Sequence, residues 1–237
     1  MLSPASAAFV FVLGLSTCSA FVSTPLAFSA RAISLRKASL SAASSRWTAQ
    51  LGAVGAQSAK SELIDLVLST SRFGTDLGED GAQRVEGLIA SLEGQSKGFD
   101  RATADGEWAL IYEINAEGSP TLQKFSQNFE SVGGSFANFD VSKNEFYNIA
   151  KLFGGNGELQ ATVEFGEVSN ADSSRISCDI VDASLQLGPL PPLPLPLRAK
   201  GGWLDFLYLD QDLRITRGNR GGLFIHVRPD LLREKMQ

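Results

Sequence analysis

The residues able to do chemistry are few, and they are spread thinly along the chain. His226 is the only histidine, and its neighbours on the same strand face, Phe224 and Arg228, supply neither a nucleophile nor an acid. A catalytic triad needs a histidine beside an activated hydroxyl, and no nucleophile elbow occurs in the sequence. We therefore expect a protein that is not an enzyme. Isomerisation or hydrolysis of a lipid through Tyr112, Tyr208 or His226 stays open as an alternative.

The pattern of cysteines, acids and glycines also gives no sign of a metal site or a cofactor. Cys18 and Cys178 are the only cysteines, and Cys18 lies in a segment that we expect to be removed, so neither a disulfide nor a cysteine metal cluster is expected. The glycine-rich residues 154–157 lack the Lys-Ser/Thr that follows a phosphate-binding loop, and they indicate a hairpin turn. Three acids are interpreted as turn and strand-edge groups that accept local hydrogen bonds: Asp205, Asp210 and Asp212.

The C-terminal stretch, residues 202–228, predicts three short antiparallel strands. They read WLDFLYL, DLRITR and LFIHVR, and a tight turn or a glycine-rich loop separates each pair. Three strands at the end of a chain leave an open sheet edge unless they pair with earlier strands. The rest of the chain must therefore supply the strands that complete the sheet.

Two arginines in the second of these strands lie on opposite faces, because side chains alternate along a strand. Leu213 and Ile215 share a face with Arg217. We therefore expect Arg217 to point inward and to contact Trp108 through a cation–π interaction. Arg214 lies on the other face, and a surface position stays open for both arginines.

The middle of the chain supplies the remaining strands. A strand opens at Gly106-Glu107-Trp108, and alternation places Trp108, Leu110 and Tyr112 on one face. Further strands are expected at about 125–139, 144–153, 158–168 and 174–187. The total of about eight strands is enough to close a barrel that holds one small ligand.

Two helices and a proline-rich segment complete the expected elements. Residues 58–71 and 79–93 carry apolar side chains at helical spacing, and both helices are too short to be stable without a partner surface. Residues 188–197 contain five prolines, which exclude a central strand. We interpret them as an extended crossover whose leucines cover apolar surface at one end of the barrel. The alternative is a docking ligand for an aromatic groove.

The N-terminal region has the composition of a two-part targeting signal. Residues 1–20 contain a short apolar run and end in small residues, as a signal peptide does, and residues 21–57 are rich in Ser and Ala with four basic residues and no acid, as a transit peptide is. The junction Cys-Ser-Ala-Phe-Val resembles the cleavage motif of algae with complex plastids. A secreted protein with a disordered Ser/Ala linker is the alternative.

The remainder of the chain is acidic. Four of the 21 basic residues precede residue 58, which leaves 17 Lys and Arg against 26 Asp and Glu, a net charge of −9. Such a body is a poor partner for nucleic acid and is not attracted to anionic lipid. Attachment to a membrane must then rest on apolar surface or on a cavity.

The run YLDQDLRITRGNRGGLF resembles the C-terminal signature of the plastid lipid-associated proteins, or plastid fibrillins. The helix pair resembles the start of that family, and Gly-x-Trp resembles lipocalin-type barrels, in which a late arginine packs over the Trp. The resemblance implies a plastid protein, mainly β, with a lipocalin-like antiparallel barrel of about eight strands after two short helices, at residues 58–237. It also implies peripheral association with thylakoids or with plastid lipid droplets (plastoglobules).

These observations predict a protein that binds an apolar lipid or isoprenoid ligand without a cofactor. Isoprenoids, quinones, carotenoids and acyl lipids all fit an apolar, aromatic-lined barrel. A structural coat or scaffold protein of lipid droplets, with a barrel filled by its own side chains, is the alternative. The expected ligand-binding residues are Trp108, Leu110, Tyr112, Phe206, Tyr208, Arg214 and Arg217.

Overall fold

The computed structural model describes residues 55, 57–70, 74, 76–114, 134–168 and 174–237. The expected signal peptide and nearly all of the expected transit peptide lie outside the described residues. So does most of the strand expected at about 125–139. No helix of the described part is both long and apolar enough to cross a membrane.

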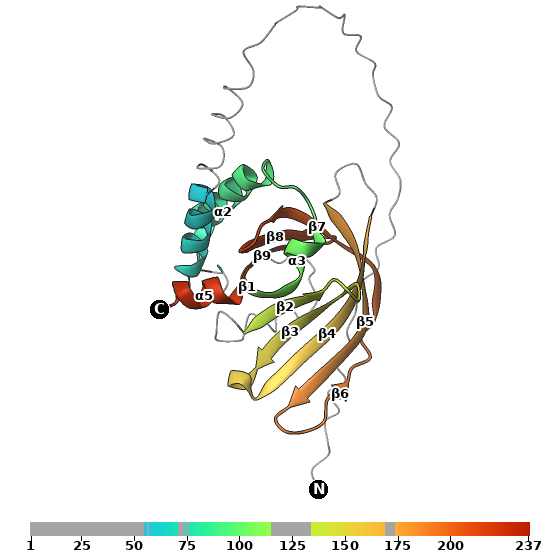
Figure 1. Cartoon of the computed structure of the whole chain (residues 1–237). Helices are drawn as coiled ribbons and strands as arrows, with labels where there is room; N and C mark the ends of the chain where they lie inside the picture. The colour runs from blue at the N-terminus through green and yellow to red at the C-terminus, as the bar shows by residue number, and fades with distance from the viewer. Residues whose placement is uncertain (1–54, 56, 71–73, 75, 115–133, 169–173) are drawn as a thin grey trace, which may run out of the picture.

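Eight antiparallel strands close into a barrel (Figure 1). The sheet order is β4-β3-β2-β1-β9-β8-β7-β5, and β5 pairs back to β4. The strands are β1 (Gly106–Ile114), β2 (Ser135–Asp140), β3 (Glu145–Leu152), β4 (Gly157–Glu167), β5 (Arg175–Leu187), β7 (Ala199–Leu209), β8 (Leu213–Gly218) and β9 (Leu223–Val227). The first strand pairs with the last, with Ala109 opposite Val227 and Leu110 opposite His226. The predicted fold, a mainly β barrel of about eight strands after two helices, is confirmed.

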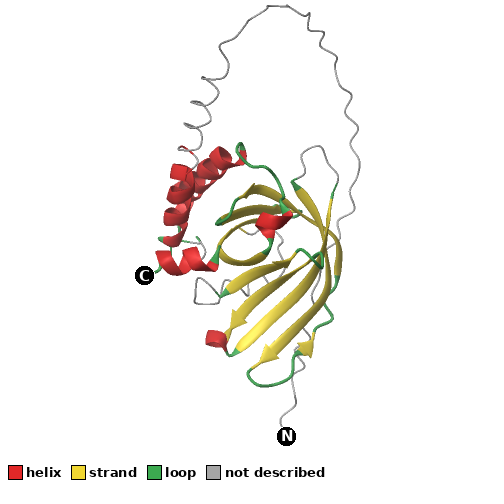
Figure 2. Ribbon diagram, in the orientation of Figure 1, coloured by secondary structure: helices red, strands yellow, loops and turns green. Residues whose placement is uncertain are grey.

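Helices cover one outer face of the barrel (Figure 2). Helical residues 57–68, helix α2 (Gly78–Glu93) and helix α5 (Pro229–Lys235) pack there. Each is amphipathic, and their buried residues form one core with the outward side chains of β1, β8 and β9. This outer core includes Leu63, Val67, Leu88, Leu92, Ile111, Leu213, Ile215 and Ile225. The barrel wall is therefore the partner surface that these short helices need.

A second core fills one end of the barrel interior with aromatic rings. Its buried members are Ala104, Trp108, Ala137, Phe139, Phe146, Val163, Phe165, Ile176 and Phe206. The rings of Phe139 and Phe146 stack with centroids 4.6 Å apart. Helix α3 (Arg101–Ala104) packs against this cluster, and the indole Nε1 of Trp108 donates a hydrogen bond to the Ala104 carbonyl at 2.8 Å. This aromatic cluster closes one end of the interior.

The proline-rich segment lies at the edge of the sheet beside β5, and some of its leucines are exposed to solvent. The two-residue strand β6 (Leu193–Pro194) pairs with β5, which agrees with the exclusion of a central strand. Leu197 is buried, whereas Leu190 and Leu193 are 61% and 60% exposed. The prediction that the leucines cover apolar surface is therefore wrong for these two residues, whose side chains face solvent in the turn after β5 and in the edge strand β6.

Arg228 joins the end of the last strand to the start of the first. Its guanidinium lies 3.7 Å from the centroid of the Trp108 ring. Four of its hydrogen bonds go to backbone carbonyls, at 2.7 Å to Thr103, 2.8 Å to Asp105, 3.1 Å to Glu107 and 3.1 Å to Gln211. A residue just past β9 thereby fixes α3, the first residues of β1 and the β7–β8 turn.

Replacing Arg228 by Met should lower the free energy of unfolding by about 3 kcal/mol. The variant loses hydrogen bonds from a charged donor and the cation–π contact while it keeps most of the apolar stem. Urea unfolding followed by circular dichroism measures the change. Arg217→Met, at an exposed position of β8, is the control and should change stability by less than about 0.5 kcal/mol. Equal stability of the two variants would contradict this role for Arg228.

Candidate functional site

The barrel interior is filled at one end and hollow at the other. A cavity of about 450 Å³ lies between the aromatic cluster and the far ends of β3, β4 and β5. This volume is within the range of small-molecule sites, about 300–1,000 Å³. Most of its wall is apolar, and includes Leu110, Phe139, Phe146, Leu159, Ile180 and Leu197. The geometry suits an elongated apolar guest.

Ionisable side chains interrupt the apolar wall, and two of them, Lys200 and Arg220, are exposed. Three others carry the polar character of the interior. They are Glu113 from β1, Arg214 from β8 and His226 from β9, and all three are buried and line the cavity. Arg214 is paired with His226 across the β8–β9 ladder, and His226 is opposite Leu110 on β1. Glu113 lies one row further along, opposite Phe224. These three buried ionisable groups are thus gathered on three adjacent strands of one wall.

Arg214 is a buried cation that forms no ion pair with any residue the structure describes. It is 3% exposed, and its Nε and Nη1 atoms make no hydrogen bond within the described structure. Its guanidinium lies 4.9 Å from the centroid of Phe139 and 5.4 Å from that of Trp108. Burial, and to a smaller extent the charge of Arg228, lowers the pKa of Arg214 to about 9. The side chain is still a cation at neutral pH.

His226 is held neutral beside this cation. It is 8% exposed, and its Nδ1 atom is buried without a hydrogen-bond partner in the described part of the chain. Burial is the main cause that lowers the pKa of His226 well below its ordinary value, and the charge of Arg214 adds to it. A neutral imidazole offers one donor and one acceptor. It therefore supports hydrogen bonding to a guest.

Glu113 and Cys178 are the remaining titratable groups of the lining that are not exposed. Burial raises the pKa of Glu113 to about 7, and no ion pair links its carboxyl to Arg214 among the described residues. Burial raises the pKa of Cys178 to about 12. Because the thiolate is the reactive form of cysteine, this thiol is inert at neutral pH.

Four of the seven predicted ligand-binding residues lie inside the barrel. Leu110 and Arg214 line the cavity. Trp108 and Phe206 are buried in the aromatic cluster, at the closed end beneath the cavity. These residues form part of the cavity wall and of the aromatic cluster that closes its end. A ligand contact for any of the four stays a prediction.

The other three lie outside the barrel interior. Tyr112 and Tyr208 pack in the core beneath the helices, because a β-bulge follows Leu110 on β1 and another follows Phe206 on β7. Each bulge moves the next side chains to the opposite face of the sheet. The prediction that Tyr112 shares a face with Trp108 is therefore wrong. The same bulge turns Glu113 inward.

Arg217 is exposed, so the prediction that it points inward over Trp108 is also wrong. Leu213 and Ile215 face the helices rather than the barrel interior, and Arg217 shares their side of β8. The inward face of β8 is the one that carries Arg214 and Thr216. The cation–π contact with Trp108 that was predicted for Arg217 is made instead by Arg214 and Arg228.

Glu113 and His226 were not predicted as ligand-site residues. His226 was considered only as a catalytic group. Its position on the last strand, beside the strand that carries Arg214, was visible in the sequence. Glu113 stands in a strand whose other residues from Trp108 to Tyr112 are all buried. An acidic residue at the end of a run of buried residues was the signal in the sequence that could have identified Glu113.

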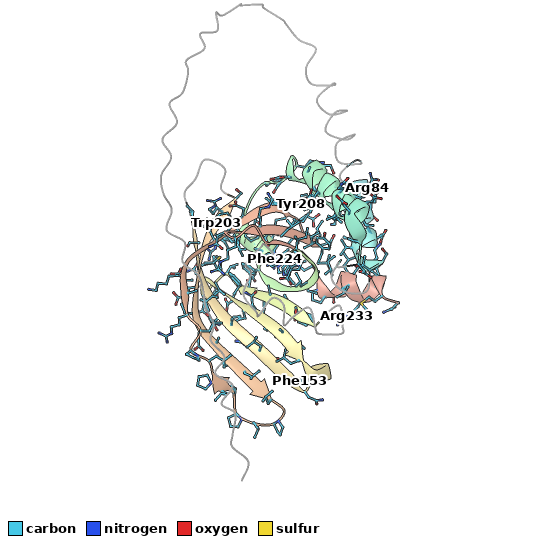
Figure 3. All side chains as sticks on the ribbon, turned by 180° about the vertical axis from the view of Figure 1, so that it is seen from behind. Arg84, Phe153, Trp203, Tyr208, Phe224 and Arg233 are labelled. Atoms are coloured by element: carbon cyan, nitrogen blue, oxygen red, sulfur yellow. The ribbon has the colours of Figure 1, made fainter. Side chains whose placement is uncertain are left out.

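An apolar tip lies at the end of the barrel remote from the helices. It consists of Phe153, Leu187, Leu190 and Leu193, all exposed. Figure 3 shows Phe153 at this end and Arg233 of helix α5 on the helical side. The backbone N–H of Gly188 donates to the Asn156 carbonyl at 2.6 Å, which joins the two loops of the tip. Residues 152–157 and 186–197 contain no charged side chain.

Comparison with known proteins gives one family. The family model PAP_fibrillin matches residues 57–227. Probable plastid-lipid-associated protein 3, chloroplastic, of Arabidopsis thaliana is 26% identical over 213 residues, and the match covers 68% of this chain and 56% of the relative. Plastoglobulin-1, chloroplastic, of Pisum sativum is 25% identical over 225 residues, with 71% and 60% covered. The chain thus spans little more than half of the length of these relatives.

One solved structure is also similar. It is a lipocalin-like protein from Bacteroides uniformis, 17% identical, and the match covers 53% of this chain and 98% of that chain with a TM-score of 0.31.

The buried acid predicts a pH dependence of stability. The pKa of Glu113 is about 7 in the folded protein and 4.5 ordinarily, so between these values the folded state holds a proton that the unfolded state lacks. The free energy of unfolding must then fall as pH rises from 4.5 to 7, by an amount on the order of 3 kcal/mol. Glu113→Gln should remove this decrease. The free energy of unfolding of the variant, relative to that of the wild type, should therefore increase between pH 4.5 and 8.

Urea unfolding at the two pH values measures that change. Glu107→Gln, at an exposed position of the same strand, is the control and should leave the pH dependence as it is in the wild type. A parallel pH dependence in the wild type and Glu113→Gln would show that burial does not hold the carboxyl in its neutral form.

Proposed function

The chain belongs to the PAP/fibrillin family, and we propose that it is a non-enzymatic plastid protein that holds an apolar small molecule inside its barrel. The proposal rests on one observation, the cavity of about 450 Å³ with a mainly apolar wall. Removing apolar surface from water stabilises a complex by about 25 cal/mol per Å². A guest that fills this cavity gains that energy without any catalytic group.

The ligands that fit this proposal are isoprenoids, quinones, carotenoids and acyl lipids. All are largely apolar, and all occur with a polar or unsaturated end that aromatic rings can contact. The names of the relatives support a plastid lipid environment. Association with thylakoids or plastoglobules is part of the proposal. The expected signal and transit peptides at residues 1–57 would provide the route of import.

Binding of an uncharged apolar probe tests the proposal. N-phenyl-1-naphthylamine should bind the full chain at one saturable site, and the fluorescence of the probe measures this binding. Ala161→Trp places an indole in the cavity wall and should weaken binding on the order of tenfold or more, since it occupies the volume of the guest.

Thr162→Trp is the matched control. Thr162 precedes Val163 and follows Ala161, both of which line the cavity, so its side chain points to the other face of β4. This variant should bind the probe as the wild type does. Binding that never saturates, or an equal loss in both variants, would count against a ligand held inside the barrel.

A coat or scaffold protein of lipid droplets is the second candidate, and the apolar tip favours it. Its exposed leucines lie in a segment without charge that spans the end of β5, the following turn and β6, while the rest of the folded chain is acidic. This combination suits an uncharged lipid surface and opposes an anionic one. The two candidates are compatible, because a tip that touches lipid lies close to cavity-lining residues such as Ala150 and Leu159.

Sedimentation with phosphatidylcholine vesicles tests the role of the tip. The double variant Leu190→Ser, Leu193→Ser should reduce vesicle binding by about tenfold or more, because each leucine loses apolar area that would be buried in lipid. Met236→Ser removes an equally exposed apolar side chain near the C-terminus and should change binding little. Equal effects of the two substitutions would argue against the tip as the lipid contact.

A further inference from the structure

We propose that the occupant of the cavity is a long-chain carboxylic acid whose carboxylate pairs with Arg214 and accepts a second hydrogen bond from His226. This inference rests on the proposed function and names the chemical class of its ligand. It assigns a head-group site at the closed end of the cavity and leaves the apolar wall to the chain of the acid.

The first support is the cost of the unpaired cation. Arg214 is almost fully buried, lines the cavity, and has two nitrogen atoms that donate to nothing in the described structure. A buried charge or donor without a partner is strongly unfavourable, and native proteins rarely keep one. A guest that supplies the missing acceptor removes this cost. The adjacent His226, with its own unpartnered Nδ1, faces the same volume.

The second support is the sign of the charge. No carboxylate in the described part of the chain forms an ion pair with Arg214, and the second cation Arg228 lies close enough to lower the pKa of Arg214. Phe139 and Trp108 offer ring faces to the guanidinium, which only partly offset a full charge. A neutral ketone or alcohol would supply a hydrogen bond without neutralising the charge. A carboxylate does both, and its planar oxygens match the donors of a guanidinium.

The third support is the direction of the cavity. Arg214 contacts the ring of Phe139, which belongs to the closed end. From there the apolar lining continues to Leu159 and Leu197, near the exposed tip. A head group at Arg214 therefore leaves room for an alkyl chain that extends toward the tip.

The remaining acid of the cavity does not compete for Arg214. Glu113 lies one row away on β1, opposite Phe224 rather than His226. Burial raises its pKa to about 7, so a substantial fraction is neutral at physiological pH. A second carboxylate can therefore enter without facing a full negative charge.

The test is a competition between matched lipids on the full chain. Oleate, oleyl alcohol and methyl oleate share one alkyl chain and differ at the head. Each is titrated against bound N-phenyl-1-naphthylamine. The affinity of oleate, measured by displacement of the probe, should be about tenfold to hundredfold higher than that of the ester or the alcohol. Neither of these can form the charged hydrogen bond of a carboxylate with Arg214.

Substitutions at Arg214 separate the head group from the chain. Arg214→Met should abolish the preference for oleate and leave the affinity for methyl oleate within about threefold, and Arg214→Lys should restore part of the preference. The neutral variant is expected to fold, since it removes an unpaired buried charge. Arg217→Met, on the opposite face of β8, is the control and should keep the full preference.

The outcomes are distinguishable. Failure of the uncharged probe to bind saturably would overturn the proposed function, and the head-group site with it. Saturable probe binding with equal displacement by acid, alcohol and ester would overturn only the carboxylate inference. A preference for oleate that survives Arg214→Met would also overturn the assignment to Arg214.

Discussion

The pairing of β1 with β9 is the constraint on which the rest of the structure depends. It joins a strand near the start of the fold to the last strand of the chain, and without it the sheet would have two open edges. Arg228 secures this seam from the end of β9 through carbonyls of α3, β1 and the β7–β8 turn. The same seam brings Leu110, Glu113 and His226 onto one wall, so closure of the barrel and assembly of the site are one event.

Two cores share the wall that this seam creates. On the outside, helices cover Leu213, Ile215 and Ile225, and inside, rings fill one end and leave the other empty. The β-bulges after Leu110 and Phe206 divide the side chains between the two. A barrel packed on one outer face can keep its interior partly hollow, because the outer core supplies stability that the interior does not.

The sequence predicted the strands well and the facing of their side chains less well. Alternation, turn residues and the C-terminal motif were enough for the mainly β barrel, the helix pair and the contact of the first strand with the last, whereas the expected strand at about 125–139 lies mostly outside the described residues. Facing failed at Tyr112, where one extra residue in a bulge leaves no mark in the pattern, and at Arg217. For Arg217 the apolar side of β8 was taken as the inside, although helices can make the outside of a barrel equally apolar. The unpaired state of Arg214 depends on what surrounds it in three dimensions, which no spacing along the chain reveals.

The order in which the chain is made bears on this architecture. Its longest-range strand pairing connects β1 to the final strand, and such pairings form slowly because a long loop must close first. Arg214, His226 and Arg228 all belong to that segment. A chain emerging from a ribosome or threading through a translocation pore therefore has no compartment and no seam until its last residues arrive. A guest can therefore enter only the finished polypeptide, and a prematurely terminated product would be an unsealed sheet.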